Sequence, residues 1–178
     1  MAVDFSRFDS EIDTAKLAKD AEEAIKNGGT GDFPEVPDGV YIAKIESMEL
    51  GETKDHRPMF KAMFRIAEAA EAVEDADFDR DNAKATKFME NWPGKKKPCI
   101  FMNRVVYGTK NDANMIASVI GFLSKLESTV TPIVFHSYSQ LSELILDIME
   151  DIDGELEYEI EYKQNSFNSV SIKDVYEV

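Results

Sequence analysis

The strongest constraint on the fold comes from residues 59–66, where two kinds of side chain alternate without a break. Every second position is apolar: Phe60, Ala62, Phe64 and Ile66. The positions between them hold two methionines and two cations: Met59, Lys61, Met63 and Arg65. A period of two residues is typical of a β-strand that buries one face and exposes the other. We therefore predict a half-buried strand whose second face is basic.

Another strand is predicted directly before this one, over residues 40–50. A Pro-Asp-Gly turn signal precedes it, and a polar turn that carries Lys54 and Arg57 follows it. The run changes character near Ser47, as expected of a strand that bends, and it adds Lys44 to the basic region. The two runs and their turn form the part of the chain on which the rest is expected to be organised.

Residues 1–32 predict an N-terminal helical arm and a linker, and residues 33–178 the main domain. Asp9 or Ser10 is the expected N-cap of the arm helix, and Asp13 falls in its first turn. An Asn-Gly-Gly sequence ends the helix. Its apolar face is weak, so the arm is expected to pack on the domain or on a partner.

After the two strands, periodicity predicts a third strand, two helices and two final strands. The bounds are residues 99–107 for the strand, 112–126 and 139–152 for the helices, and 155–163 and 167–176 for the final strands. Residues 130–135 favour a further short strand. Residues 67–81, rich in Ala, Glu and Asp, predict either a short helix or a mobile acidic loop.

Three strands, a helical segment and two more strands is the order of the five-stranded oligonucleotide/oligosaccharide-binding (OB) barrel, whose helix lies between strands three and four. We therefore predict a mainly β fold with α-helices (α+β). It is an OB-like barrel with an enlarged helical insertion between strands 3 and 4. A plain α+β sheet has a similar order of elements and stays open as an alternative.

The net charge of −15, from 20 Lys and Arg against 35 Asp and Glu, is unevenly distributed. Residues 37–110 hold 13 basic and 13 acidic residues, and seven of those acids fall within residues 68–81. Without residues 67–81 this part of the chain carries 12 basic against 6 acidic residues. The chain is therefore acidic with a segregated basic part. The simpler interpretation is that most of these lysines are solvated surface.

In the predicted strand over residues 155–163, glutamate occupies every second position, opposite to an apolar face. The glutamates are Glu155, Glu157, Glu159 and Glu161. A row of carboxylates repels phosphate, so this outer face is not expected to bind nucleic acid.

Catalysis, a cofactor and a metal site are not expected. His56 and His136 lie far apart without neighbouring ligand-spaced residues, and Cys99 has no nearby histidine in the sequence. Gly28, Gly29 and Gly31 lack the preceding strand and the Lys-Ser/Thr of a phosphate-binding loop. The N-terminus has no signal-peptide pattern and no apolar run is long enough to span a membrane. One cysteine fits a reducing cytoplasm.

Binding chemistry is better supplied, because cations that follow a phosphate backbone and aromatic rings that stack on bases recognise single-stranded DNA. The candidate DNA-binding residues fall on the first loop, the sheet face, the lysine-rich turn and the last loop. They are Lys44, Lys54, Arg57, Lys61, Arg65, Trp92, Lys95, Lys96, Lys97, Arg104, Lys163 and Phe167. Simpler roles stay open: Trp92 would pin a loop, the lysine triplet would aid solubility, and Phe101 and Tyr107 would belong to the core.

Three segments resemble a family of small bacteriophage single-stranded DNA-binding proteins with an OB-type barrel. They are PDGVYIAKIESMELGETK, the turn of residues 54–58 leading into FKAMFRI, and EYEIEYKQNSFNSVSIKDVY. The helix rich in Ile, Phe and Leu after the third strand is similar too, so the resemblance covers residues 36–178 in outline.

By this resemblance Lys54 and Arg57 match the first-loop positions, and residues 165–168 match the turn of the last hairpin. The chain departs from the family in having Asp-His-Arg where many relatives carry a glycine. It also ends in a predicted strand rather than in the acidic tail with which many relatives recruit replication enzymes.

The first hypothesis is therefore a non-enzymatic protein that binds single-stranded DNA without base specificity in phage replication or recombination. It would act in the cytoplasm of an infected bacterium, and no membrane partner is expected. Replication or recombination proteins, bound through acidic surfaces, and a second copy of the chain are further partners left open. The alternative is an acidic phage interaction module or DNA mimic that binds or inhibits a host nucleic-acid-binding enzyme.

Overall fold

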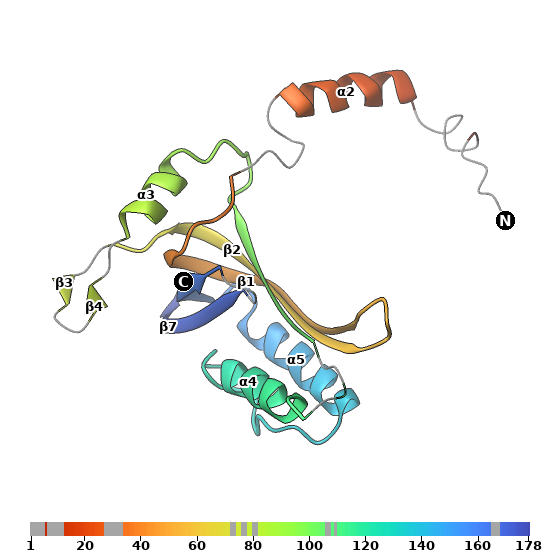
Figure 1. Ribbon diagram of the computed structural model, residues 1–178, viewed down its shortest axis with the longest axis vertical. Helices are drawn as coiled ribbons and strands as arrows, with labels where there is room; N and C mark the ends of the chain where they lie inside the picture. Colours follow the sequence, from red (N-terminus) through yellow and green to blue (C-terminus); the bar gives the residue numbers. More distant parts are fainter. Residues whose placement is uncertain are drawn as a thin grey trace. The chain divides into compact units, whose positions relative to one another are not determined.

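The structure, a computed structural model, describes residue 6 and residues 13–26, 34–71, 74–75, 78–79, 82–105, 108, 110–164 and 168–178. By internal contacts the chain divides into two units. The first comprises residues 1–35 together with 92–96, and the second residues 36–91 together with 97–178. Figure 1 shows the elements coloured along the sequence.

The first unit contains helix α2 (Thr14–Lys26). The expected caps Asp9 and Ser10 lie outside the described residues. Asp13, expected in the first turn, is itself the N-cap, because its Oδ1 accepts a hydrogen bond from the Lys16 amide at 3.1 Å. The helix therefore begins later than an Asp9 or Ser10 cap would place it.

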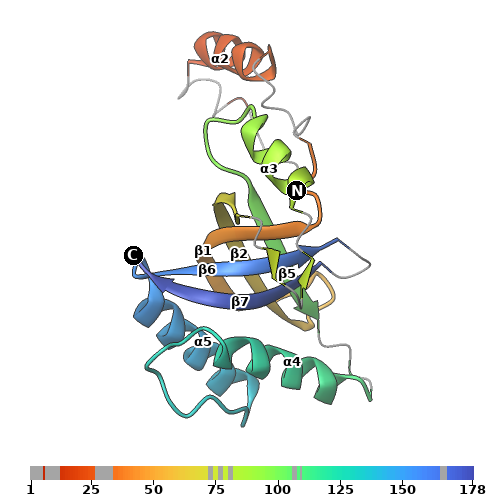
Figure 2. The same cartoon turned by 90° about the vertical axis from the view of Figure 1, so that its left-hand side faces the viewer.

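The second unit is built on five antiparallel strands. They are β1 (Gly39–Glu52), β2 (Pro58–Ala69), β5 (Cys99–Val105), β6 (Leu156–Lys163) and β7 (Ser169–Glu177). Their order in the sheet is β5-β2-β1-β6-β7 (Figures 1 and 2). The α+β class is confirmed, and the five strands predicted for the sheet are present.

Two helices cover the buried face of this sheet. They are α4 (Asp112–Ser124) and α5 (Tyr138–Ile152), which lie beneath the sheet in both views (Figures 1 and 2). Ser137 caps α5 through a hydrogen bond from the Gln140 amide to its hydroxyl at 3.1 Å. Both helices fall close to their predicted bounds. The short strand predicted over residues 130–135 is wrong, since this segment is an irregular connection.

The acidic segment after β2 forms no helix in its described part. Residues 67–69 continue β2, and a small hairpin follows, made of β3 (Glu74–Asp75) and β4 (Phe78–Asp79). Helix α3 (Ala83–Glu90) comes next and lies at the opposite end of the sheet from α4 and α5 (Figure 2).

The alternation predicted for residues 59–66 is confirmed. Phe60, Ala62, Phe64 and Ile66 are all at most 2% exposed. The rings of Phe60 and Phe64 lie 5.8 and 6.0 Å from the ring of Phe122 on α4, edge to face. Each such buried ring contributes roughly 1.5–3 kcal/mol of transfer free energy. The alternating hydrophobic pattern therefore fixes which face of β2 the helices cover.

Asn82, at the start of α3, holds β1 where β2 ends. Its side chain accepts a hydrogen bond from the Val40 amide at 2.9 Å and donates to the carbonyls of Val40 and Ala70 at 2.9 and 2.7 Å. Asn82 is 3% exposed, so these contacts replace water for the buried backbone groups. Gly39 makes room, because a Cβ there would lie 2.8 Å from both Asn82 Oδ1 and Ala85.

The sheet is curled by single-residue bulges but is not closed into a barrel. Ile45 and Ser47 of β1 are opposed to the consecutive residues Phe64 and Met63 of β2, so Glu46 is an extra residue in β1. Lys173 is an extra residue of the same kind in β7. In the described residues, the edge strands β5 and β7 are not joined by backbone hydrogen bonds. Side chains link β5 to the residue before β7. Arg104 Nη2 donates to the Asn168 carbonyl at 3.0 Å, and Asn168 Nδ2 donates to the Phe101 carbonyl at 3.2 Å.

Candidate nucleic-acid interface

The candidate interface is the solvent-facing side of β2 and β5, which we name the β2–β5 outer face. Directly opposed residues of an antiparallel pair share a face. The register pairs Lys61 with Asn103, Met63 with Phe101, and Arg65 with Cys99. The outer face therefore consists of two cations, a methionine, an aromatic ring, an amide and a thiol at adjacent positions.

Phe101 is the aromatic side chain of this face. It is 52% exposed, whereas its neighbours Ile100 and Met102 are buried. The interpretation of Phe101 as a core residue is wrong, and Tyr107 lies outside the described residues. In the sequence CIFMNRV, apolar side chains occupy both alternate sets of positions, so periodicity alone does not tell which set is buried. The pairing of Phe101 with Met63 places Phe101 on the outer face, and this pairing could not be read from the sequence.

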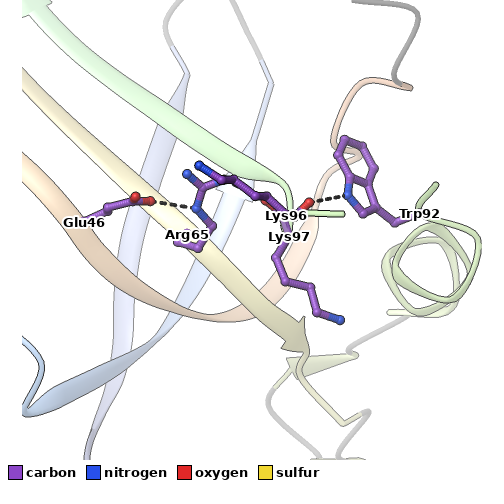
Figure 3. A network of polar contacts seen from close by, with 5 residues as sticks. All are labelled: Glu46, Arg65, Trp92, Lys96 and Lys97. Atoms are coloured by element: carbon purple, nitrogen blue, oxygen red, sulfur yellow. Dashed lines mark hydrogen bonds and ion pairs between the residues drawn. The ribbon is translucent and has the colours of Figure 1, made fainter. Parts of the chain in front are cut away.

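Arg65 lies on the outer face and is held by two acceptors. Its Nε donates to Glu46 Oε2 at 2.6 Å, and its Nη1 donates to the Lys97 carbonyl at 2.7 Å (Figure 3). The hydrogen bond that Arg65 donates to Glu46 raises the pKa of Arg65, against a smaller opposing effect of burial. The carboxylate therefore occupies one edge of the guanidinium, the kind of edge that a phosphate also binds.

Lys61 is likewise accompanied by an acid. Its Nζ lies 3.8 Å from Glu49 Oε1, and the two residues are directly opposed between β1 and β2. The Lys61 side chain is partly exposed and that of Glu49 largely exposed, and such surface pairs contribute little to stability. Lys44 faces Arg65 across the same pair of strands. The predicted basic face thus exists, but Glu46 and Glu49 compensate much of its charge.

The first-loop candidates lie at the tip of the β1–β2 hairpin (Figure 1). Lys54 is exposed and Arg57 half-buried, and the Arg57 amide donates to Thr53 Oγ1 at 3.1 Å. His56 has a left-handed φ of 60°. A glycine adopts this conformation without strain. The left-handed residue of this turn is therefore the histidine of the Asp-His-Arg sequence.

The expectation that Arg104 shares the outer face with Lys61 and Arg65 is wrong. Arg104 is directly opposed to Phe60, so its side chain leaves β5 on the buried face. It is half-buried at the end of the strand, and burial lowers the pKa of its guanidinium. Arg104 therefore belongs to a different site from Arg65.

Trp92 and the lysine-rich turn form a small closed loop. The Trp92 indole Nε1 donates to the Lys96 carbonyl at 2.8 Å (Figure 3). A Cβ on Gly94 would lie 2.6 Å from this indole nitrogen, so glycine lets the ring cross the loop. Lys95, Lys96 and Lys97 are exposed. This arrangement agrees with the interpretation of Trp92 as a residue that pins its loop.

The last-loop candidates are only partly described. Lys163 is exposed and lies 3.2 Å from Glu161, while Phe167 lies outside the described residues. The neighbouring face of β6 is not the open row of carboxylates that was expected. Glu159 is buried and accepts a hydrogen bond from the Tyr176 hydroxyl at 3.1 Å, and Lys173 lies 3.6 Å from Glu161. Cations and a hydroxyl cover these glutamates because β7 lies beside them.

In the part of the chain that the structure describes, no group of His, Cys, Asp or Glu side chains is arranged to hold a metal ion. No described helix is long and apolar enough to cross a membrane. Comparison of the sequence with protein-family models and with curated proteins gives no match.

Proposed function

We propose that the protein binds single-stranded DNA without sequence preference across the β2–β5 outer face. The observation that carries the proposal is Phe101, an exposed aromatic ring directly beside Met63 and between the cationic side chains of β2. An aromatic side chain stacks on any base, because every base has a π-face. Lys61 and Arg65 would bind the phosphates on either side.

The proposed fold is an OB-like barrel left open at the seam between β5 and β7. In OB folds the strands equivalent to β2 and β5 and the first and last loops contact the ligand. Here Lys54 and Arg57 flank the outer face from the first loop, and Lys163 and Phe167 are the candidates at the last. A role in phage replication or recombination is proposed on the resemblance alone.

DNA binding on this face would replace existing ion pairs rather than add new ones. Glu46 and Glu49 accompany Arg65 and Lys61 in the unbound protein, so phosphates would replace these carboxylates. The net gain per cation is then small, and stacking, worth about 1–3 kcal/mol per base, supplies much of the affinity. The acidic total charge of −15 further limits affinity at low salt.

The test is a fluorescence-anisotropy titration of labelled oligo(dT) with the full chain and with Phe101→Ala. Loss of one stacked base predicts about 5- to 150-fold weaker binding. Leu146→Ala is the matched control, because Leu146 is 56% exposed on α5, away from the outer face. Binding must also weaken as salt rises. Failure of the wild-type chain to bind oligo(dT), or equal affinities of wild type and Phe101→Ala, would refute the proposal.

A second candidate function is an acidic interaction module or DNA mimic. The exposed Leu146 favours it, because Glu143, Asp147 and Glu150 surround it on α5 with exposed carboxylates. An apolar side chain within an acidic surface suits a basic protein partner. On this alternative Leu146→Ala, not Phe101→Ala, weakens capture of a purified nucleic-acid-binding protein, and oligo(dT) displaces the captured protein.

A further inference from the structure

A second basic site lies on the buried side of β5, at the open seam of the sheet. A cavity of about 350 Å³ is lined there by residues of β5, α4 and β7. Its polar wall consists of Arg104, Lys125, Ser118, Ser169 and Ser171, and apolar side chains such as Met102 and Phe122 form the remainder. The cavity therefore combines cations and hydroxyl-bearing residues with an apolar floor.

The charge of this cavity is unusual for so acidic a chain. None of the described residues around it is Asp or Glu, although the chain holds 35 of them. A larger cavity of about 410 Å³ beside β1 and β6 shows the contrast. Its cations Lys44, Arg65 and Lys97 are balanced by Glu46, Asp153 and Glu157. Only the seam cavity, of these two, presents uncompensated positive charge.

Among the described residues, Arg104 has only neutral hydrogen-bond acceptors. Its guanidinium donates to the carbonyls of Asn103 and Asn168 at 2.9 and 3.0 Å, and both of these acceptors are neutral. Burial of a cation without an anionic partner costs free energy, and it is this burial that lowers the pKa of Arg104. A guanidinium carries five N–H groups, so donors remain after these two bonds.

The other walls supply complementary donors. Lys125 is the exposed C-cap residue of α4 and forms no ion pair with any described residue. The Ser118 side chain makes no hydrogen bond within the described part of the chain. Ser169 and Ser171 are opposed to Lys163 and Glu161, so they border the cavity with their backbone and not with their hydroxyl groups. Ser169 and Ser171 also belong to the edge strand β7, and an edge strand presents unpaired backbone amides. Two cations and several neutral donors converge on one cavity.

We propose that the seam cavity binds a phosphate group, either as inorganic phosphate or as a small phosphomonoester. Bidentate binding by a guanidinium suits a phosphate, and a lysine adds a point charge on another side. The cavity exceeds a lone phosphate in size, and its apolar floor would contact the organic part of a monoester. The bound anion would link β5, β7 and α4. This site is independent of DNA binding on the outer face.

The experiment is a ¹H–¹⁵N NMR titration of the full chain at constant ionic strength with three probes. They are inorganic phosphate, thymidine 5′-monophosphate, and oligo(dT) without terminal phosphates. We expect saturable shifts of the amides of residues 104, 118, 125 and 169–171 with the first two probes only. Tighter binding of the monophosphate than of inorganic phosphate would assign the organic part to the apolar floor.

Lys125→Ala and Lys110→Ala provide the matched variants, since both lysines are exposed and flank opposite ends of α4. Loss of one charge-assisted hydrogen bond predicts about tenfold weaker phosphate binding for Lys125→Ala and no change for Lys110→Ala. Arg104→Lys keeps the positive charge but removes the paired N–H donors of the guanidinium, so it is expected to weaken phosphate binding as well.

Three results would overturn the proposal. One is the absence of saturable shifts with both small probes, and another is equal affinity of the two lysine variants. The third is that only the oligonucleotide shifts these amides, which would assign the cavity to the DNA backbone. After either of the first two results, Arg104 would serve only to hold β5 against the segment before β7.

Discussion

The two faces of the β2–β5 pair use one backbone for different purposes. On the inner face, Phe60 and Phe64 are buried against α4. On the outer face, one residue away in each strand, Lys61, Arg65 and Phe101 reach solvent, and the two cations lie beside carboxylates from β1. Because adjacent residues of a strand point to opposite faces, neighbouring substitutions should separate stability from binding.

The largest expected effect tests the inner face. Phe64→Ala should lower the free energy of unfolding by about 3–5 kcal/mol, because it leaves a cavity beside Phe122. Phe101→Ala makes the same chemical change on the outer face and should cost no more than about 1 kcal/mol. Urea denaturation followed by circular dichroism measures both. Equal losses would mean that Phe101 belongs to the core after all.

The next effect tests the contact of Asn82, at the start of α3, with β1 and with the residue that follows β2. Asn82→Ala should cost about 1–3 kcal/mol, since it leaves the buried amide and carbonyl of Val40 without their side-chain partner. Asn103→Ala, an exposed amide on the outer face, should change stability by about 0.5 kcal/mol at most. The same denaturation experiment compares them, and similar midpoints would contradict the role given to Asn82.

The contrast between the inner and outer faces also explains which parts of the fold could be predicted from the sequence. Where apolar and polar residues alternate cleanly, as in residues 59–66, the buried set follows from the period of two, and burial agrees with it. In β6 the apolar Tyr158, Ile160 and Tyr162 are buried as expected, but Glu159 between them is buried as well. Helices α4 and α5 followed from their apolar spacing. In β5, where both sets are apolar, the faces of Phe101 and Arg104 depend on pairing with β2. That pairing is a long-range property.

The acidic partners of the cations on the outer face could not be predicted from the sequence, for a related reason. The bulge at Glu46 inserts one residue into β1, and this brings its carboxylate to Arg65, 19 positions later. Nothing local marks a bulge at this position. The burial of Glu159 likewise depends on Tyr176, which only the pairing of β6 with β7 brings near. The sequence therefore indicated which cations share the outer face of β2 but not their acidic partners.

A smaller effect tests the outer face as a path for phosphates. Lys61→Gln should make the slope of log affinity against log salt shallower by about 0.7, the value for one phosphate contact on a single strand. Lys110→Gln, outside this face, should leave the slope unchanged. Anisotropy titrations with oligo(dT) at several salt concentrations give the slopes. An equal change of the slope in both variants would indicate that DNA affinity depends only on the total charge of the protein.

The smallest effect is also the most specific, because it reverses the usual sign of a substitution in a binding face. Glu46→Gln keeps the shape of the side chain but removes the charge that competes for Arg65, so affinity for oligo(dT) should rise a few-fold. The surface pair itself contributes only about 0–1 kcal/mol, and stability should change little. Glu143→Gln on α5 makes the same change in total charge and is the control. If both variants tighten binding equally, long-range charge explains the gain. A gain confined to Glu46→Gln would mean that the bulge of β1 sets the affinity by holding a carboxylate where a phosphate binds.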